Sequence, residues 1–144
     1  MKTIVKPVYY CDFCGKRGLS KYHMGNHEKH CTMNPNRHCR VCDNDEVSKE
    51  TIQKINNSFK LIVEKDDPAL LYGEVVVKWL SEPINHDSLL KMADGCPACA
   101  LALFRQSNLC CPEVYGEVGF DYQKAKSDHW RQRNDEQERY AMYY

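Results

Sequence analysis

Cysteine and histidine residues near the start of the chain have the spacing of a tetrahedral zinc site. Two residues separate Cys11 from Cys14, and three residues separate His27 from Cys31. A Cys-x2-Cys turn presents two thiolates together, and residues four apart in a helix lie on the same face. Thiolate and imidazole are donors that zinc prefers, so these four side chains predict one structural zinc ion.

Two neighbouring histidines are alternative candidates for ligands of this zinc site. His23 precedes His27 by four residues, and His30 follows it by three. We prefer Cys31 as the fourth ligand because thiolate binds zinc well and the gap of three residues is typical of small zinc sites. His23 and His30 are therefore expected to face solvent.

Residues 9–31 resemble a single C2H2-type zinc finger in its Cys-Cys-His-Cys variant. Tyr9 and Met24 stand where these fingers place the apolar side chains that pack around the metal. Gly18 occupies a position where the family usually has Phe, and we expect Leu19 to take its place. The resemblance covers only this stretch, and it implies two short strands followed by a helix.

A second pair of Cys-x2-Cys sequences predicts a second zinc ion. Cys39 and Cys42 follow the finger, and Cys96 and Cys99 lie far along the chain. Two such turns can form a four-cysteine site even when the intervening chain is long. This zinc would clamp the helical body to the segment leaving the finger, and so support a chain too short for a large apolar core.

A redox pair is the competing interpretation of Cys96 and Cys99. Pro97 lies between them and a helical sequence follows, and a cysteine at a helix N-terminus has a lowered pKa. No apolar strand precedes this segment, as a thioredoxin-like βαβ unit would require, so we favour zinc. Cys110 and Cys111 are left outside both sites, and we expect them to be buried as small hydrophobes.

Composition indicates an intracellular protein of modest size. The chain has 144 residues, nine of them cysteine. The first ten residues contain no apolar signal segment and no stretch is long enough to span a membrane, so we expect a reducing, cytoplasmic location, with a virion as the other candidate.

The balanced net charge conceals a basic beginning. Residues 1–42 contain eight basic and two acidic side chains, a formal charge of +6, and the rest of the chain carries −6. Such asymmetry points to an anionic partner such as nucleic acid, or to a basic region that docks on the chain's own acidic part.

The remaining sequence reads mainly as helix. Ser20 and Ser48 can cap helices, and apolar residues at 52, 55, 59 and 62 form a helical stripe. Asp67-Pro68 would start another helix, although residues 75–77 are three valines that also suit a strand. Further helices are predicted at 88–94, beginning at Asp87 or Ser88, and from Pro97, whereas 114–122 reads as a loop or strand pair and 121–144 as a polar helix.

These patterns predict a mainly α, small α+β fold: a ββα-like zinc finger joined to a zinc-clamped helical body with an extended C-terminal tail. We assign 1–36 to the finger, 37–112 to the body closed by the four-cysteine site, and 113–144 to an aromatic-rich tail that docks on partners. Seven of the fifteen aromatic residues fall in the tail.

The predicted function is a zinc-dependent interaction module without catalytic activity. By the family resemblance, Ser20, His23 and Asn26 would face nucleic-acid bases, with Lys16, Arg17 and Lys21 near phosphates. The alternative is a structural or adaptor component of a multi-subunit particle, such as a virion, that contacts only proteins. Neither interpretation involves a membrane or a small-molecule substrate.

Catalysis is disfavoured because both predicted zinc sites are filled by four protein ligands, whereas hydrolytic zinc keeps an open position. The paired turns are similar to those of zinc-bearing His-Asn-His nucleases, but the Asp-His pair is missing. The His-x-Glu signature of zinc deaminases is also missing. Thiol redox chemistry at Cys96 and Cys99 stays as the least favoured activity.

Overall fold

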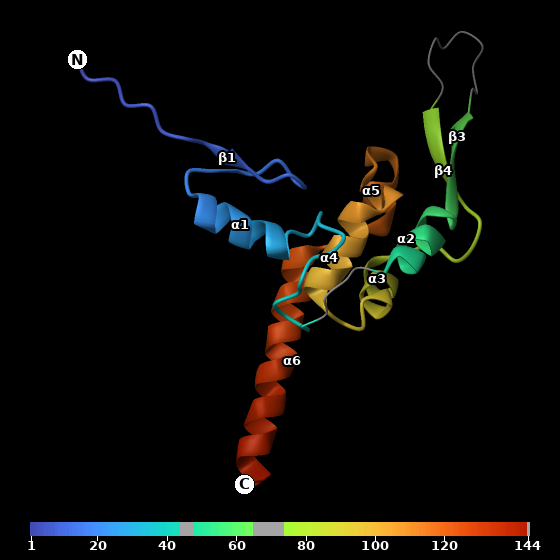
Figure 1. The fold of residues 1–144 in the computed structure, drawn as a ribbon. Helices are drawn as coiled ribbons and strands as arrows, with labels where there is room; N and C mark the ends of the chain where they lie inside the picture. The colour runs from blue at the N-terminus through green and yellow to red at the C-terminus, as the bar shows by residue number, and fades with distance from the viewer. Residues whose placement is uncertain (44–47, 65–73, 144) are drawn as a thin grey trace. The chain divides into compact units, whose positions relative to one another are not determined.

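The computed structural model describes residues 1–43, 48–64 and 74–143 (Figure 1). It is a small α+β fold that divides into two compact units, Met1–Val47 and Ser48–Tyr144. No helix among the described residues is both long and apolar enough to cross a membrane.

The first unit is a two-stranded hairpin followed by one helix. Its elements are β1 (Tyr9–Tyr10), β2 (Arg17–Gly18) and α1 (Lys21–His30). The strands are antiparallel, with Tyr9 opposite Gly18. Ser20 caps the helix as predicted, because its hydroxyl accepts a hydrogen bond from the backbone of His23. The first unit thus consists of one short β-hairpin and one capped helix.

The apolar core of the first unit is small. Met24, Cys11 and Cys31 are its buried members, and Tyr9, Cys14 and Met33 pack against them. So little apolar burial contributes only a few kcal/mol. Residues 1–47 therefore need another source of stability.

The structure shows why glycine is accommodated at position 18, and the reason is not the expected replacement of the family's Phe by Leu19. Leu19 does not fill the space of the missing Phe, because its side chain is 63% exposed. Instead, a Cβ atom at Gly18 would lie 2.8 Å from Cε of Met24. The Met24 side chain thus occupies that space, and the absence of a side chain at Gly18 makes room for it.

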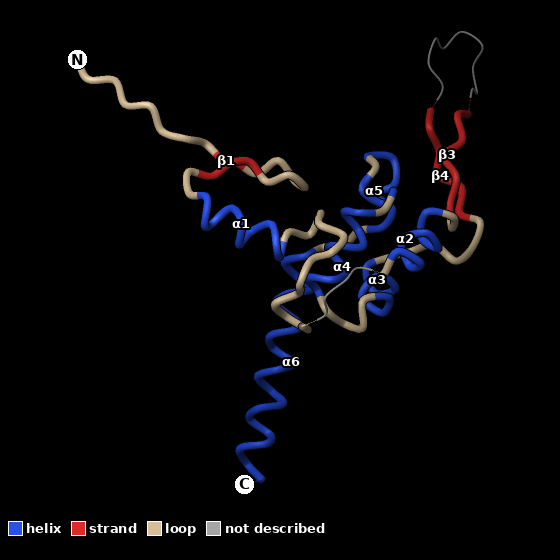
Figure 2. Tube along the Cα trace, viewed as in Figure 1, coloured by secondary structure: helices blue, strands red, loops and turns tan. Residues whose placement is uncertain are grey.

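The second unit combines a β-hairpin with five α-helices and a short 3-10 helix in its described residues (Figure 2). In chain order these are α2 (Lys49–Asn56), β3 (Phe59–Glu64), β4 (Glu74–Trp79), α3 (His86–Met92), α4 (Pro97–Gln106), η1 (Asn108–Cys110), α5 (Pro112–Val118) and α6 (Tyr122–Tyr143).

Two segments differ from the secondary structure that the sequence predicts. The helix from Ser48 ends at Asn56, and 59–64 pairs with 74–79 as antiparallel strands, because β-branched and aromatic residues dominate both segments. Residues 112–118 form a helix with Pro112 in its first turn and Gly119 ending it in the left-handed conformation, so the expected loop or strand pair is wrong. The helix start expected at Asp67-Pro68 lies outside the described residues, but residues 74–79 form strand β4, so the alternative of a strand at the three valines 75–77 is confirmed.

The core of the second unit lies where the shorter helices meet. Its large, deeply buried side chains include Ile55, Leu89, Leu109, Val114 and Val118, each at most 2% exposed. Phe120 joins this core, with its ring centroid 5.7 Å from that of Phe104. This unit therefore has the conventional apolar core that the first unit lacks.

Helix α6 is the main exposed element. Ala125 is its buried residue, and every described residue after Trp130 is exposed. Tyr140, Met142 and Tyr143 leave 72–84% of their surfaces in solvent. The predicted tail is thus mainly helical, and among its aromatic residues Phe120 is buried in the core, whereas Tyr140 and Tyr143 are exposed at the end of α6.

Candidate metal centres

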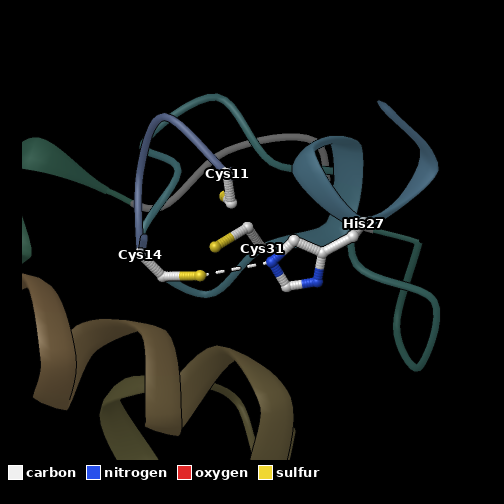
Figure 3. Close-up of side chains that lie close together, drawn as sticks. All are labelled: Cys11, Cys14, His27 and Cys31. Atoms are coloured by element: carbon white, nitrogen blue, oxygen red, sulfur yellow. Dashed lines mark hydrogen bonds between the residues drawn. The ribbon is translucent and has the colours of Figure 1, made fainter. Parts of the chain in front are cut away.

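The structure brings Cys11, Cys14, His27 and Cys31 together, with their ligand atoms all within 4.8 Å of one another (Figure 3). Cys11 and Cys14 come from the turn after β1, His27 from the last turn of α1, and Cys31 from its C-cap. These four residues could hold a metal ion.

Hydrogen bonds fix the turn that carries the first two thiols. The backbone N–H of Cys11 donates to the carbonyl of Lys16, and that of Gly15 donates to the carbonyl of Cys11, both at 2.9 Å. Gly15 has a positive φ of 70°, which glycine adopts without strain. The backbone N–H of Asp12 donates to Oε1 of Glu28, tying this turn to α1.

The donor set and the distances fit zinc. Sγ of Cys14 lies 3.2 Å from Nε2 of His27, and tetrahedral zinc holds a sulfur and a nitrogen ligand about 3.5 Å apart. Two sulfur ligands would be about 3.8 Å apart, which is compatible with the 4.8 Å limit on this cluster. Small movements of these side chains would bring their ligand atoms to the distances of tetrahedral zinc coordination.

The electrostatics of the metal-free cluster favour one thiolate. Burial raises the pKa of Cys14, but hydrogen bonds from the Lys16 backbone and from His27, Cys11 and Cys31 outweigh it and lower the pKa to about 6. Burial and the neighbouring thiols raise the pKa of Cys31 to about 11. A metal ion arriving at neutral pH would therefore meet a thiolate at Cys14 and displace a proton from Cys31.

The neighbouring histidines lie outside the cluster. His23 is exposed, and Nδ1 of His30 donates a hydrogen bond to the carbonyl of His38 at 2.8 Å. The structure therefore places His27, and neither of these rings, beside the three thiols.

Asn34 is a supporting residue whose role the sequence did not reveal. It is 7% exposed, its Nδ2 donates to the carbonyl of Glu28 at 2.8 Å, and its Oδ1 accepts from the backbone of Asn36. These bonds hold the end of α1, which carries two of the clustered ligands. The Asn34-Pro35 pair predicted only a turn.

Replacing Asn34 by alanine is expected to weaken zinc binding at the first cluster about 10- to 100-fold, because the end of α1 loses the buried partner that orients it. Competition with a coloured chelator measures this. Asn36→Ala is the matched control, since Asn36 is exposed and contributes its backbone N–H. Equal affinities for the two variants would contradict the assigned role.

The second group contains four thiols, Cys39, Cys42, Cys96 and Cys99, whose sulfur atoms also lie within 4.8 Å of one another. Cys39 is fully buried, and the backbone N–H of Val41 donates to its sulfur at 3.4 Å. Cys96 is the N-cap of α4 and Cys99 lies in its first turn. An all-sulfur set of four is typical of structural zinc, so this group could hold a second ion.

Cys110 and Cys111 lie outside both groups, but they are not the buried residues expected. Cys110 is exposed, and its thiol donates to the carbonyl of Ser107 at 3.2 Å. Cys111 is half-buried at the start of α5.

The side chains predicted to contact nucleic acid are mostly at the surface. Lys16, Arg17, Lys21 and His23 are exposed, and Asn26 is half-buried. The hydroxyl of Ser20 is engaged in capping α1 at 3.3 Å. Ser20 thus has a structural role at the start of α1, and its contact with bases stays a prediction.

Comparisons with protein-family models, curated proteins and solved structures gave no match. The two Cys/His groups are therefore the features on which a functional assignment rests.

Proposed function

We propose that this chain is a non-enzymatic, double-zinc interaction module whose basic first unit binds nucleic acid. The observation that carries the proposal is the pair of four-ligand groups, each of the size and donor chemistry of a structural zinc site. With four protein ligands on each ion, the metal would have a structural role and leave binding to the surrounding surface.

Charge and exposure support nucleic acid as the partner. The basic residues of 1–42 outnumber the acidic ones by six, and Lys16, Arg17 and Lys21 are exposed on the small zinc-bearing unit. Phosphate contacts from such side chains supply affinity without sequence preference. One finger-sized unit buries too little surface for specificity on its own, so we propose general rather than sequence-specific binding.

Salt dependence tests this proposal. Binding of the zinc-loaded chain to labelled DNA, followed by fluorescence anisotropy, is expected to weaken at least about 10-fold between 50 and 200 mM salt, because bound counterions are released. The triple variant Lys16→Gln, Arg17→Gln and Lys21→Gln should lower the slope of log K against log salt by about two to three.

The matched control neutralises Lys91, Lys124 and Lys126, which are exposed in the second unit. Its slope should equal that of the unmodified chain. Binding that is independent of salt, or equal losses in the two triple variants, would count against nucleic-acid binding by the first unit.

A second candidate function is a structural or adaptor component that contacts proteins. The observation favouring it is the end of α6, where the large side chains of Tyr140, Met142 and Tyr143 are 72–84% exposed. Tyrosine and methionine are enriched at protein interfaces. Absence of nucleic-acid binding at both salt concentrations would favour this candidate.

A further inference from the structure

Three aromatic rings of the first unit lie outside its core. Tyr10 is 60% exposed, Phe13 41% and Tyr22 78%, whereas the metal cluster is packed by Met24 and Tyr9. In a unit this small, solvent-exposed rings contribute little to folding. Their presence on the surface therefore needs another explanation.

Each ring lies beside a basic residue. Tyr10 is the cross-strand partner of Arg17, and paired residues of an antiparallel ladder point to the same face. Phe13 lies in the turn that the Cys11–Lys16 hydrogen bond closes. Tyr22 follows Lys21 in the first turn of α1, and its ring lies 5.6 Å from that of His23, which is also exposed. Exposed rings and basic residues thus occur together on the hairpin and at the start of α1.

This combination suits unpaired bases better than a double helix. Bases in a duplex stack on one another and show only their edges in the grooves, whereas single strands expose base faces on which aromatic rings can stack. Duplex reading by α1 is weakened, since Ser20 is committed to capping and Asn26 is half-buried. The basic side chains could contact the phosphates of a single strand or of a duplex equally well.

We propose that the first unit binds single-stranded nucleic acid, with Tyr10, Phe13 and Tyr22 stacking on bases and Lys16, Arg17 and Lys21 pairing with phosphates. This inference rests on the proposed nucleic-acid function and specifies its ligand. Stacking and phosphate contacts do not read the edges of bases, so this binding should tolerate different sequences, and stacking is available in both DNA and RNA.

The test compares single strands with a duplex, using the full zinc-loaded chain. Labelled DNA and RNA strands of about 12 nucleotides, and the DNA duplex of the same sequence, are titrated by fluorescence anisotropy at about 50 mM salt. Tighter binding of either single strand than of the duplex is expected. Phe13→Leu and Tyr22→Leu should each weaken single-strand binding about 5- to 150-fold, and duplex binding much less.

Tyr143→Leu is the matched control, because Tyr143 is 84% exposed in the second unit; it should leave binding unchanged. Zinc content and circular dichroism check each variant, and Tyr22→Leu remains informative if Phe13→Leu disturbs the metal turn. Tighter duplex binding, or single-strand affinity unaffected by Tyr22→Leu, would overturn the single-strand inference alone. Failure to bind any of these probes would overturn the nucleic-acid proposal itself.

Discussion

Replacing Cys14 by serine is expected to reduce the zinc content from two ions per chain to one and to unfold residues 9–31. Cys14 is the thiol whose pKa is lowered to about 6, so it supplies the thiolate most readily available to the metal at neutral pH. Structural zinc contributes roughly 10–16 kcal/mol in finger peptides. The core around Met24 is too small to compensate for that loss.

Elemental analysis measures the zinc content, and amide NMR signals report separately on the two units. Cys110→Ser is the matched control, because it removes a thiol that lies outside both groups. Cys110→Ser should keep two zinc ions and a folded first unit. A Cys14→Ser variant that retained both ions would show that the four residues around Cys14 are not a zinc site.

The first cluster could be predicted because its ligands are local in sequence. Cys11 and Cys14 lie in one turn, and His27 and Cys31 lie four residues apart at the end of a helix, so local geometry brings each pair together without knowledge of the fold. Supporting contacts were harder to predict. The bond from Asn34 to the carbonyl of Glu28 depends on how the chain reverses after α1, which composition does not specify.

The strand at 59–64 shows why one of the helix predictions was wrong. Apolar residues at 55, 59 and 62 fit a helical stripe, yet an unbroken apolar run at 61–63 suits a strand equally well when a partner is available. That partner is the valine run at 75–77, which pairs with it in register. A contact between segments so far apart in sequence decides the structure, so local periodicity alone gave the wrong answer.

Gly18 and Met24 illustrate the same limit within the finger-like stretch. The family pattern directs attention to a missing Phe and to its neighbour Leu19. The structure instead places the end of the Met24 side chain where a side chain on Gly18 would start. This contact between α1 and β2 depends on the fold, so the sequence pattern alone does not predict it.

Replacing Cys96 by serine is expected to remove the other zinc ion, with a consequence different from that of Cys14→Ser. Leu89, Leu109 and Val114 are fully buried in the second unit, so its helices should persist without the metal. The zinc content should fall to one, and residues 9–31 should stay folded around the first ion. Loss of this structural metal should still lower the free energy of unfolding by more than ~4 kcal/mol, a loss larger than most point mutations cause.

This variant also separates zinc binding from redox chemistry at Cys96 and Cys99. A redox pair would leave the unmodified chain with one zinc ion and with catalysed disulfide reduction that Cys96→Ser abolishes. A structural site instead gives two ions and no such activity, because thiolates bound to zinc are not available to attack a disulfide. Cys39→Ser completes the test: it should lower the zinc content as Cys96→Ser does, since Cys39 belongs to the same group of four thiols. A redox pair would be indifferent to that change, so a zinc content in Cys39→Ser equal to that of the unmodified chain would exclude the four-cysteine assignment.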